Sequence, residues 1–218
     1  MKSALYEQLG RVGQALGSAA RLQILEYIAQ GERSVDELAR MTGFSVANTS
    51  KHLQALRQAG LVAARREGLR VYYAIAGDDV VALVSALRAV AEQRVAEVER
   101  LVRQWLAPRD EMQPVPAAEL LKRLKKREVT VLDVRPAEEY AAGHIPGAIN
   151  VPVEKLESFL SRLPKRKEVV AYCRGPYCLM SFEAVGKLRK HGLRARRLEH
   201  GLPEWRAAGL PVARQSKA

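Results

Sequence analysis

Both cysteines of the chain lie in one hexapeptide, residues 173–178, which reads Cys-Arg-Gly-Pro-Tyr-Cys. The run Glu168–Tyr172 before it has the pattern of a short buried strand, and Leu179–Lys190 after it has helical spacing. A cysteine at such a junction lies where backbone N–H groups and the positive end of a helix converge, which lowers the pKa of a thiol. The spacing therefore predicts a nucleophilic sulfur in this loop.

A second group of polar side chains opens a helix predicted from Ser45 to Gly60. A shorter helix precedes it, capped by Ser34 with Glu37 and ended by Gly43, so the two have a helix-turn-helix pattern. The first turns of the second helix carry groups that can reach base edges and phosphates: Ser45, Asn48, Thr49, Ser50, Lys51 and His52. The alternative is an ordinary polar helix face.

Three arginines flank the tip of a hairpin predicted from Leu61–Arg66 and Arg70–Ile75. These side chains, Arg65, Arg66 and Arg70, are expected to hold DNA phosphates beside the helix. A solvated hairpin is the alternative here. Together with the helix residues they make double-stranded DNA the expected partner.

The composition restricts the class of protein. The 218 residues are 48% apolar and 28% charged, which is enough for two domains with their own cores. The net charge of +12 favours anionic partners, with +3 on residues 1–110 and +9 on residues 111–218. We expect a cytoplasmic protein with no membrane partner, because the sequence shows neither a signal peptide nor an apolar span of about 18 residues. Two cysteines so close in sequence cannot form a disulfide framework that stabilises a whole domain.

The elements that must position these groups fall into two halves, separated by a proline-rich linker at 107–116. Residues 1–106 predict helices, a hairpin and a last helix over about 78–106, whose long apolar stripe indicates a partner helix from a second copy. In residues 117–218 strands alternate with helices, which predicts an α/β domain with a largely parallel sheet flanked by helices.

Residues 1–106 resemble the ArsR family of winged-helix repressors. The resemblance is carried by Ala20–Leu25, Ser45–Leu53, Leu56–Val62, Arg65–Gly68 and Val71–Tyr73. It implies a mainly α winged helix-turn-helix that binds operator DNA as a homodimer built on its first and last helices. Many relatives sense metals through cysteines on the third helix or through Asp and His on the last. This chain has neither cysteine in this half nor a histidine on the last helix, so we expect no metal site.

Residues 114–213 resemble a rhodanese domain, through Leu132–Arg135, Gly143–Asn150, Tyr172–Arg174 and the Gly201–Trp205 and Gly209–Val212 runs. The resemblance implies that Cys173 accepts a sulfane sulfur as a persulfide, with Arg174 as the guanidinium that holds an anionic donor. Loops of the family often have Arg where this chain has Cys178, which puts efficient thiosulfate turnover in doubt. Cys178 is then either a resolving cysteine or an inert apolar side chain. Asp133, Arg135 and His144 are interpreted as structural residues.

The combined hypothesis is a DNA-binding repressor in which sulfur, persulfide or redox chemistry at Cys173 either controls DNA binding or supplies a linked activity. The expected small-molecule partner is a sulfane-sulfur donor or another thiol-reactive anion, and no cofactor is required. Two alternatives remain at this point. The chain is a sulfurtransferase, or a thiol-dependent oxyanion reductase of the arsenate type, and its winged helix serves dimerisation.

Overall fold

The computed structural model describes residues 2–106, 113–164 and 166–215. Contacts divide the chain into two compact units, Met1–Val84 and Ser85–Ala218. This boundary falls inside a helix, whereas the sequence had suggested the linker 107–116. Residues 107–112 of that linker lie outside the described part. No helix among the described residues is long and apolar enough to cross a membrane.

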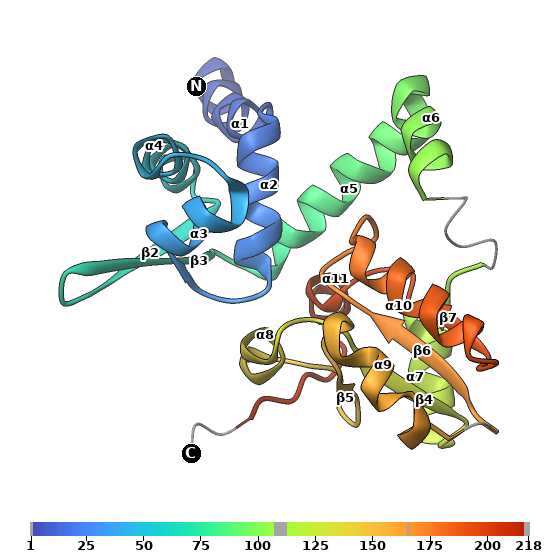
Figure 1. The fold of residues 1–218 in the computed structure, drawn as a ribbon. Helices are drawn as coiled ribbons and strands as arrows, with labels where there is room; N and C mark the ends of the chain where they lie inside the picture. Colours follow the sequence, from blue (N-terminus) through green and yellow to red (C-terminus); the bar gives the residue numbers. More distant parts are fainter. Residues whose placement is uncertain (1, 107–112, 165, 216–218) are drawn as a thin grey trace. The chain divides into compact units, whose positions relative to one another are not determined.

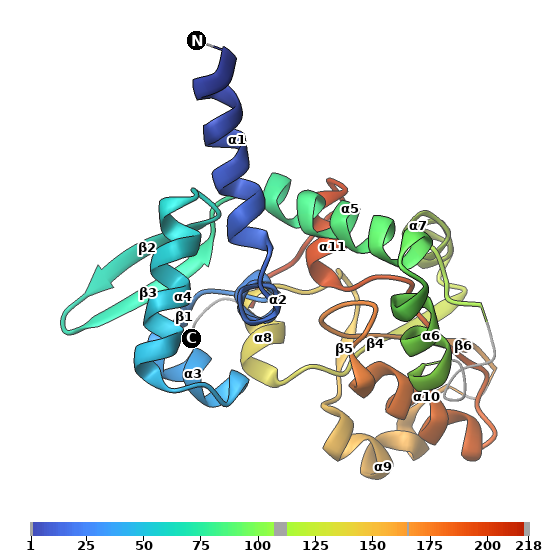
Figure 2. The same cartoon turned by 90° about the horizontal axis from the view of Figure 1, so that it is seen from above.

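The first unit is mainly helical, with a small antiparallel sheet in the order β1-β3-β2 (Figure 1). Its elements are α1 Lys2–Leu16, α2 Ala19–Ala29, β1 Arg33–Ser34, α3 Val35–Thr42, α4 Val46–Gln58, β2 Val62–Glu67, β3 Arg70–Ile75 and the start of α5, Asp78–Arg94. The β2–β3 hairpin extends away from the helices as a wing, which Figure 2 shows from above. The architecture is the predicted winged helix-turn-helix.

Local sequence sets the boundaries of α3 and α4. The Ser34 hydroxyl accepts from the Glu37 backbone N–H while the Glu37 carboxylate accepts from that of Ser34, which is the predicted capping box. Gly43 ends α3 in the left-handed region at φ 75°, which glycine adopts without a Cβ penalty. Ser45 caps α4 by accepting from the Asn48 N–H. Ser18 is the N-cap residue of α2, but its side chain makes no cap hydrogen bond.

The predicted helix over 78–106 is in fact two helices, α5 and α6 (Ala96–Trp105). Val95 separates them in an extended conformation, with φ −110° and ψ 100°. Its N–H still donates to Ala91, and its carbonyl accepts from Val98, so it ends one helix and starts the next. A β-branched side chain favours this geometry over a helical one. The apolar stripe is therefore interrupted at Val95.

The second unit contains the predicted parallel sheet, in the order β5-β4-β6-β7. Its strands are β4 Val129–Asp133, β5 Ile149–Asn150, β6 Glu168–Tyr172 and β7 Ala195–Arg197. Its helices after α6 are α7 Ala117–Lys125, α8 Ala137–Ala142, α9 Leu156–Phe159, α10 Leu179–Lys190 and α11 Leu202–Ala207, with short 3-10 turns at Val153–Lys155 and Leu160–Arg162.

Alternate residues of the central strands face two separate cores. On β6, Val169 and Ala171 pack with α9 and α10, whereas Val170 and Tyr172 pack with α7 and α11. Cys173 continues the first of these faces, directly after the strand. Cys173 therefore lies at the carboxyl end of the sheet, where ligands of open α/β sheets bind.

Part of the predicted linker belongs to the sheet. Val115 is fully buried and forms a parallel bridge with Leu198. Its N–H donates to the Arg197 carbonyl, and its own carbonyl accepts from Glu199. An apolar β-branched residue between two prolines is extended and can extend the sheet edge, so residues 113–116 are not a free spacer.

Candidate functional site

The two cysteines of the predicted loop are joined by a disulfide. Cys173 follows β6 and is 2% exposed, and Cys178 is the half-buried N-cap of α10. Their Cα atoms are 6.3 Å apart, within the span that a disulfide bridges. Both sulfur atoms therefore lie at the start of α10, where the helix dipole favours negative charge. This is the strand–loop–helix junction that the sequence indicated.

Arg174, the predicted donor-binding guanidinium, makes a bidentate ion pair with Glu139 of α8. Its Nη2 lies 2.7 Å from Glu139 Oε1, and its Nε lies 3.1 Å from both carboxylate oxygens. The Glu139 side chain is 1% exposed and that of Arg174 is 17% exposed. The sequence analysis did not identify Glu139, although an acidic residue in the first turn of a short helix is a recognisable candidate for such a pair.

Glycine at position 201 is required by the cysteine loop. A Cβ built on Gly201 would lie 2.3 Å from the Arg174 carbonyl oxygen and 2.6 Å from the Gly175 nitrogen. The backbone N–H of Gly201 donates to the Glu204 carboxylate at 3.0 Å, which opens α11. The loop between the cysteines therefore packs directly on the start of α11, a support that the sequence analysis missed.

A buried polar network ties the strand ends below the loop. Asp133 and Arg135 are both fully buried, with Arg135 Nη2 2.6 Å from Asp133 Oδ2. The Tyr172 hydroxyl donates to the same oxygen at 2.5 Å and accepts from the Ile145 N–H. Burial and the Asp133 charge raise the pKa of Tyr172, so its proton is retained. Asp133 and Arg135 thus tie segments of the second unit together.

His144 is also structural. It is 7% exposed, its Nδ1 lies 2.9 Å from the Tyr140 carbonyl oxygen, and its ring stacks on that of Tyr140. Its backbone exchanges two hydrogen bonds with Ala213. These contacts hold the turn before Ile145 and account for the imidazole without a catalytic role.

The predicted DNA-reading residues on α4 divide by exposure. Ser45, Asn48 and Lys51 are exposed, and Ser50 and His52 are half-buried. The prediction that Thr49 contacts DNA is wrong, because its side chain is fully buried and its hydroxyl donates to the Ser45 carbonyl at 3.0 Å. Thr49 is next to the exposed Asn48 in sequence, but the helical period places its side chain on the face of α4 that packs on the core.

Two features of α4 add to the predicted set. Val46 is 51% exposed in the first turn, beside the polar candidates, and an apolar group there can contact a thymine methyl. Burial, with the charges of Arg21 and Lys51, lowers the pKa of His52, so its ring is neutral at pH 7. A neutral imidazole both donates and accepts hydrogen bonds.

The arginines of the wing are exposed as predicted, but one of them has carboxylate partners. Arg65 pairs with Glu32 at 2.8 Å and with Glu67 at 2.7 Å, and these hydrogen bonds raise its pKa. Arg66 donates to the Gly68 carbonyl at 3.2 Å. A DNA phosphate at Arg65 would have to compete with two carboxylates. Leu69 at the wing tip is 98% exposed, a feature that no pattern in the sequence had marked.

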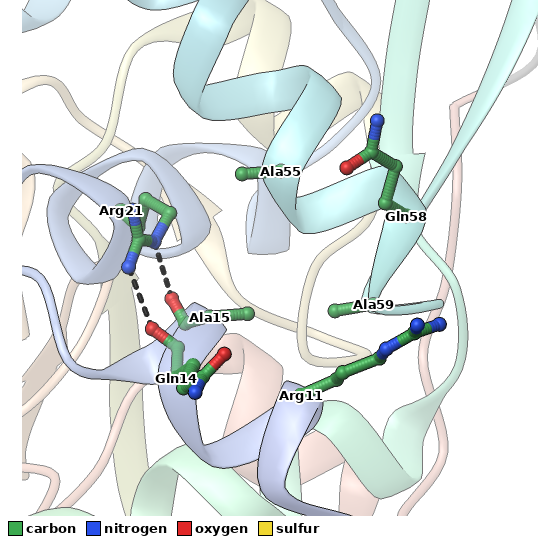
Figure 3. Close-up of a pocket in the computed structure, with 7 residues that line it drawn as sticks. All are labelled: Arg11, Gln14, Ala15, Arg21, Ala55, Gln58 and Ala59. Carbon is green, nitrogen blue, oxygen red and sulfur yellow. Dashed lines mark hydrogen bonds between the residues drawn. The ribbon is translucent and has the colours of Figure 1, made fainter. Parts of the chain in front are cut away.

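A cavity of about 550 Å³ lies between α1, α2 and α4 (Figure 3). Arg21 on its wall is directed at the end of α1, where Nε donates to the Ala15 carbonyl at 2.5 Å and Nη2 to that of Gln14 at 2.6 Å. A guanidinium that satisfies two terminal carbonyls is a helix cap. This role accounts for Arg21 without a ligand.

No group of three or more His, Cys, Asp or Glu side chains suited to a metal ion is found among the described residues. The start of α3 and the length of α5 and α6 carry no cysteine or histidine.

Two family models match this chain. Residues 18–64 match the model described as "Bacterial regulatory protein, arsR family", and residues 116–208 match "Rhodanese-like domain". The first match covers the helix-turn-helix, and the second covers the sheet, the cysteine loop and α11.

Individual proteins agree with these models. The chain is 49% identical over 212 residues, 97% of its length and 92% of the relative's, to the HTH-type transcriptional regulator Rv0324 of Mycobacterium tuberculosis. It is 34% identical to a sulfurtransferase of Allochromatium vinosum over 39% of this chain and 78% of that protein. A homodimeric winged helix-turn-helix domain from Mycobacterium bovis is 50% identical over 43% of this chain and 87% of its own, with a TM-score of 0.41.

Proposed function

Since the chain belongs to the ArsR family of bacterial transcriptional regulators and carries a rhodanese-like domain, we propose that it is a repressor whose operator affinity is set by sulfur chemistry at Cys173. The observation that carries the proposal is the pairing of Cys173 with Cys178 in the loop at the start of α10. Such a pair in a DNA-binding regulator can exist in two covalent states, and a two-state element is what regulation requires.

The proposed chemistry has two steps. The Cys173 thiolate attacks the outer sulfur of a sulfane-sulfur donor, takes that sulfur as a persulfide, and releases the rest of the donor as an anion. The Cys178 thiol then attacks the inner sulfur of the persulfide. The Cys173–Cys178 disulfide forms and hydrosulfide leaves. The Arg174 guanidinium is already ion-paired with Glu139, so an anionic donor would bind to it beside that carboxylate.

The DNA-binding form is proposed to be a homodimer on operator DNA. Apolar side chains of α1 are left exposed in the single chain, with Leu5 60%, Tyr6 61% and Leu9 57% exposed, and Leu87 and Val90 of α5 are 40% and 59% exposed. Exposed apolar stripes of this kind are covered by a second copy in symmetric dimers. The dimer would present two copies of α4 and of the wing to a pseudo-palindromic duplex.

A second candidate function is sulfur transfer as such. The match to a protein named sulfurtransferase favours it, since it lies on the half that holds Cys173. The two functions differ in where the sulfur ends. A repressor stops at a stable disulfide or persulfide, whereas a sulfurtransferase passes the sulfur to an acceptor in many turnovers.

Intact mass measurement of the full chain tests the chemistry. An inorganic polysulfide is expected to add sulfur to Cys178→Ser but not to Cys173→Ser, and the wild type is expected to end as a disulfide two mass units below the reduced protein. Sulfur addition to Cys173→Ser alone would overturn the assignment of Cys173. Multiple turnovers with thiosulfate and cyanide would favour the sulfurtransferase, and turnover of arsenate with a thiol would favour the reductase.

A further inference from the structure

Tyr177, inside the cysteine loop, contacts the second half of α5 within the unit Ser85–Ala218. Its hydroxyl donates to the Glu92 carboxylate, and the Arg88 guanidinium carbon lies 5.2 Å from the centre of its ring. Arg88 and Glu92 are four positions apart, so they lie on one face of the helix. A single turn of α5 thus holds Tyr177 by its hydroxyl and by its ring.

A second contact joins the same turn of α5 to the other side of the loop. Arg88 Nη1 lies 3.1 Å from Glu204 Oε1, and the two side chains are only 19% and 12% exposed. The other Glu204 oxygen accepts from the Gly201 N–H, and Gly201 packs on the peptide between Arg174 and Gly175. The cysteine loop is therefore tied to α5 through Tyr177 and through Glu204.

The helix that receives both contacts also belongs to the first unit. It runs without interruption from Asp78 to Arg94, and Val80 near its start is buried in the core that contains Leu53 and Leu56 of α4. Such a helix rises roughly 18 Å along its own axis from Val80 to Glu92. The element that Tyr177 contacts is therefore continuous in the chain with the DNA-binding unit.

The covalent state of the cysteines constrains the position of Tyr177. In the disulfide form the two Cα atoms are held 6.3 Å apart, and Tyr177 immediately precedes Cys178. Two thiols, or a persulfide and a thiol, impose no such limit. Pro176 and Tyr177 line a cavity of about 380 Å³ whose wall includes Arg88 and Glu92, so the ring has space to move when the bond opens.

We propose that α5 detects the state of the Cys173–Cys178 pair through the Tyr177–Glu92 hydrogen bond and passes it to the DNA-binding unit. Tyr177 and Glu92 are positioning residues, since neither acts on the sulfur. The inference rests on the proposed function, because it supplies the route by which sulfur chemistry would change operator affinity. Burial and the Glu92 carboxylate raise the pKa of Tyr177, so the phenol stays a donor at neutral pH.

The test compares the operator Kd of the reduced and the polysulfide-treated full chain, as a ratio, in the wild type, Tyr177→Phe and Glu92→Ala. Both variants are expected to form the disulfide by mass while their Kd ratio falls from the wild-type value of at least about 5 toward 1, because the hydrogen bond to a charged group that carries the coupling is removed. The double variant should lose no more than either single one. Glu97→Ala is the control, since Glu97 pairs with Arg100 on α6 and not with the loop.

Variants that form the disulfide and keep the wild-type ratio would overturn the inference. A wild-type ratio of 1 would instead overturn the proposed function, so the two failures are distinguishable. Hydrogen exchange of the untreated and treated wild type gives a readout without substitutions. The amides of residues 85–94 are expected to change protection on disulfide formation, and unchanged protection there would also overturn the inference.

Discussion

At the scale of single residues, the cysteine loop is held by groups that carry no sulfur chemistry of their own. Glu139 pairs with Arg174, and Gly201 lies against the Arg174–Gly175 peptide. The Glu139 side chain is 1% exposed, so removing Arg174 would leave a buried carboxylate without this ion pair. The geometry of the loop thus depends on packing as well as on the cysteines.

Gly201→Ala tests this support. The added methyl would lie 2.3 Å from a backbone oxygen, so α11 or the loop must move, and we expect the second unit to lose about 1–3 kcal/mol of its free energy of unfolding. Urea unfolding followed by the fluorescence of buried Trp205 measures the loss. Gly186→Ala is the control, because nothing lies within 4 Å of its Cβ position inside α10. Equal stabilities of the two variants would contradict the account.

At the scale of elements, the sequence predicted the helix-turn-helix, the wing and the strand Glu168–Tyr172 within one or two residues. Their signals are local, as in the capping box of Ser34 or the apolar run Glu168–Tyr172. The errors arise where tertiary contacts decide. Val95 breaks a helix although its apolar period continues, and Val115 joins a sheet edge from within a proline-rich run. Thr49 was misplaced although its spacing from the buried Leu53 and Leu56 marks the core-facing side of α4.

The same limit applies to the candidate site. The two cysteines and Arg174 were predicted because they are close in sequence. Glu139, Gly201 and Glu204 contact them from distant segments, and their types are common in helices and turns. One partner of Arg65 was missed for the same reason, since Glu32 is 33 residues away in the sequence.

The ion pairs of Glu168, at the start of β6, predict a pH dependence of the stability of the second unit. Burial alone would raise the pKa of Glu168, but its ion pairs with Arg196 and Arg123 outweigh this and lower it. A lowered folded-state pKa stabilises the fold above the ordinary value of 4.5, and this stabilisation is lost as the pH falls through the lowered value.

We therefore expect Glu168→Gln to cost about 1–3 kcal/mol of unfolding free energy at pH 7, because charged hydrogen bonds to β7 and α7 are removed. The difference from the wild type should shrink below about pH 4.5, where the wild-type carboxylate is progressively protonated. Thermal unfolding of the second unit over a pH series measures it. A difference that is constant from pH 7 to pH 3 would contradict the ion-pair assignment.

The α4 helix and the wing should respond differently to substitution. Asn48→Ala removes an amide that can read a base edge, so roughly 1–3 kcal/mol of discrimination between operator variants is expected to disappear. Arg66→Ala removes a proposed phosphate contact, so binding should weaken for all duplexes and the salt slope should fall by about 1. Titrations of cognate and scrambled duplexes at several salt concentrations separate the two. Identical losses on every duplex from both variants would remove α4 as the reading helix.

At the scale of the whole molecule, the sequence between the ArsR-type DNA-binding half and the rhodanese-like half consists of α5, α6 and a proline-rich segment. The relative from Mycobacterium tuberculosis spans the same two halves, since it matches 97% of this chain. The proposed function requires that the covalent state of the cysteines changes operator affinity. It needs no turnover, because a single modification per chain is sufficient for a switch.

The most direct measurement of this claim is the operator Kd of the full chain before and after treatment with an inorganic polysulfide, with dithiothreitol reversal. The wild type is expected to change its Kd by at least about 5-fold, the lower range of allosteric coupling, and to recover on reduction. Cys173→Ser should bind with one Kd throughout. A wild-type Kd that stays the same while mass spectrometry shows complete Cys173–Cys178 disulfide would contradict the account and leave the rhodanese half as a separate activity.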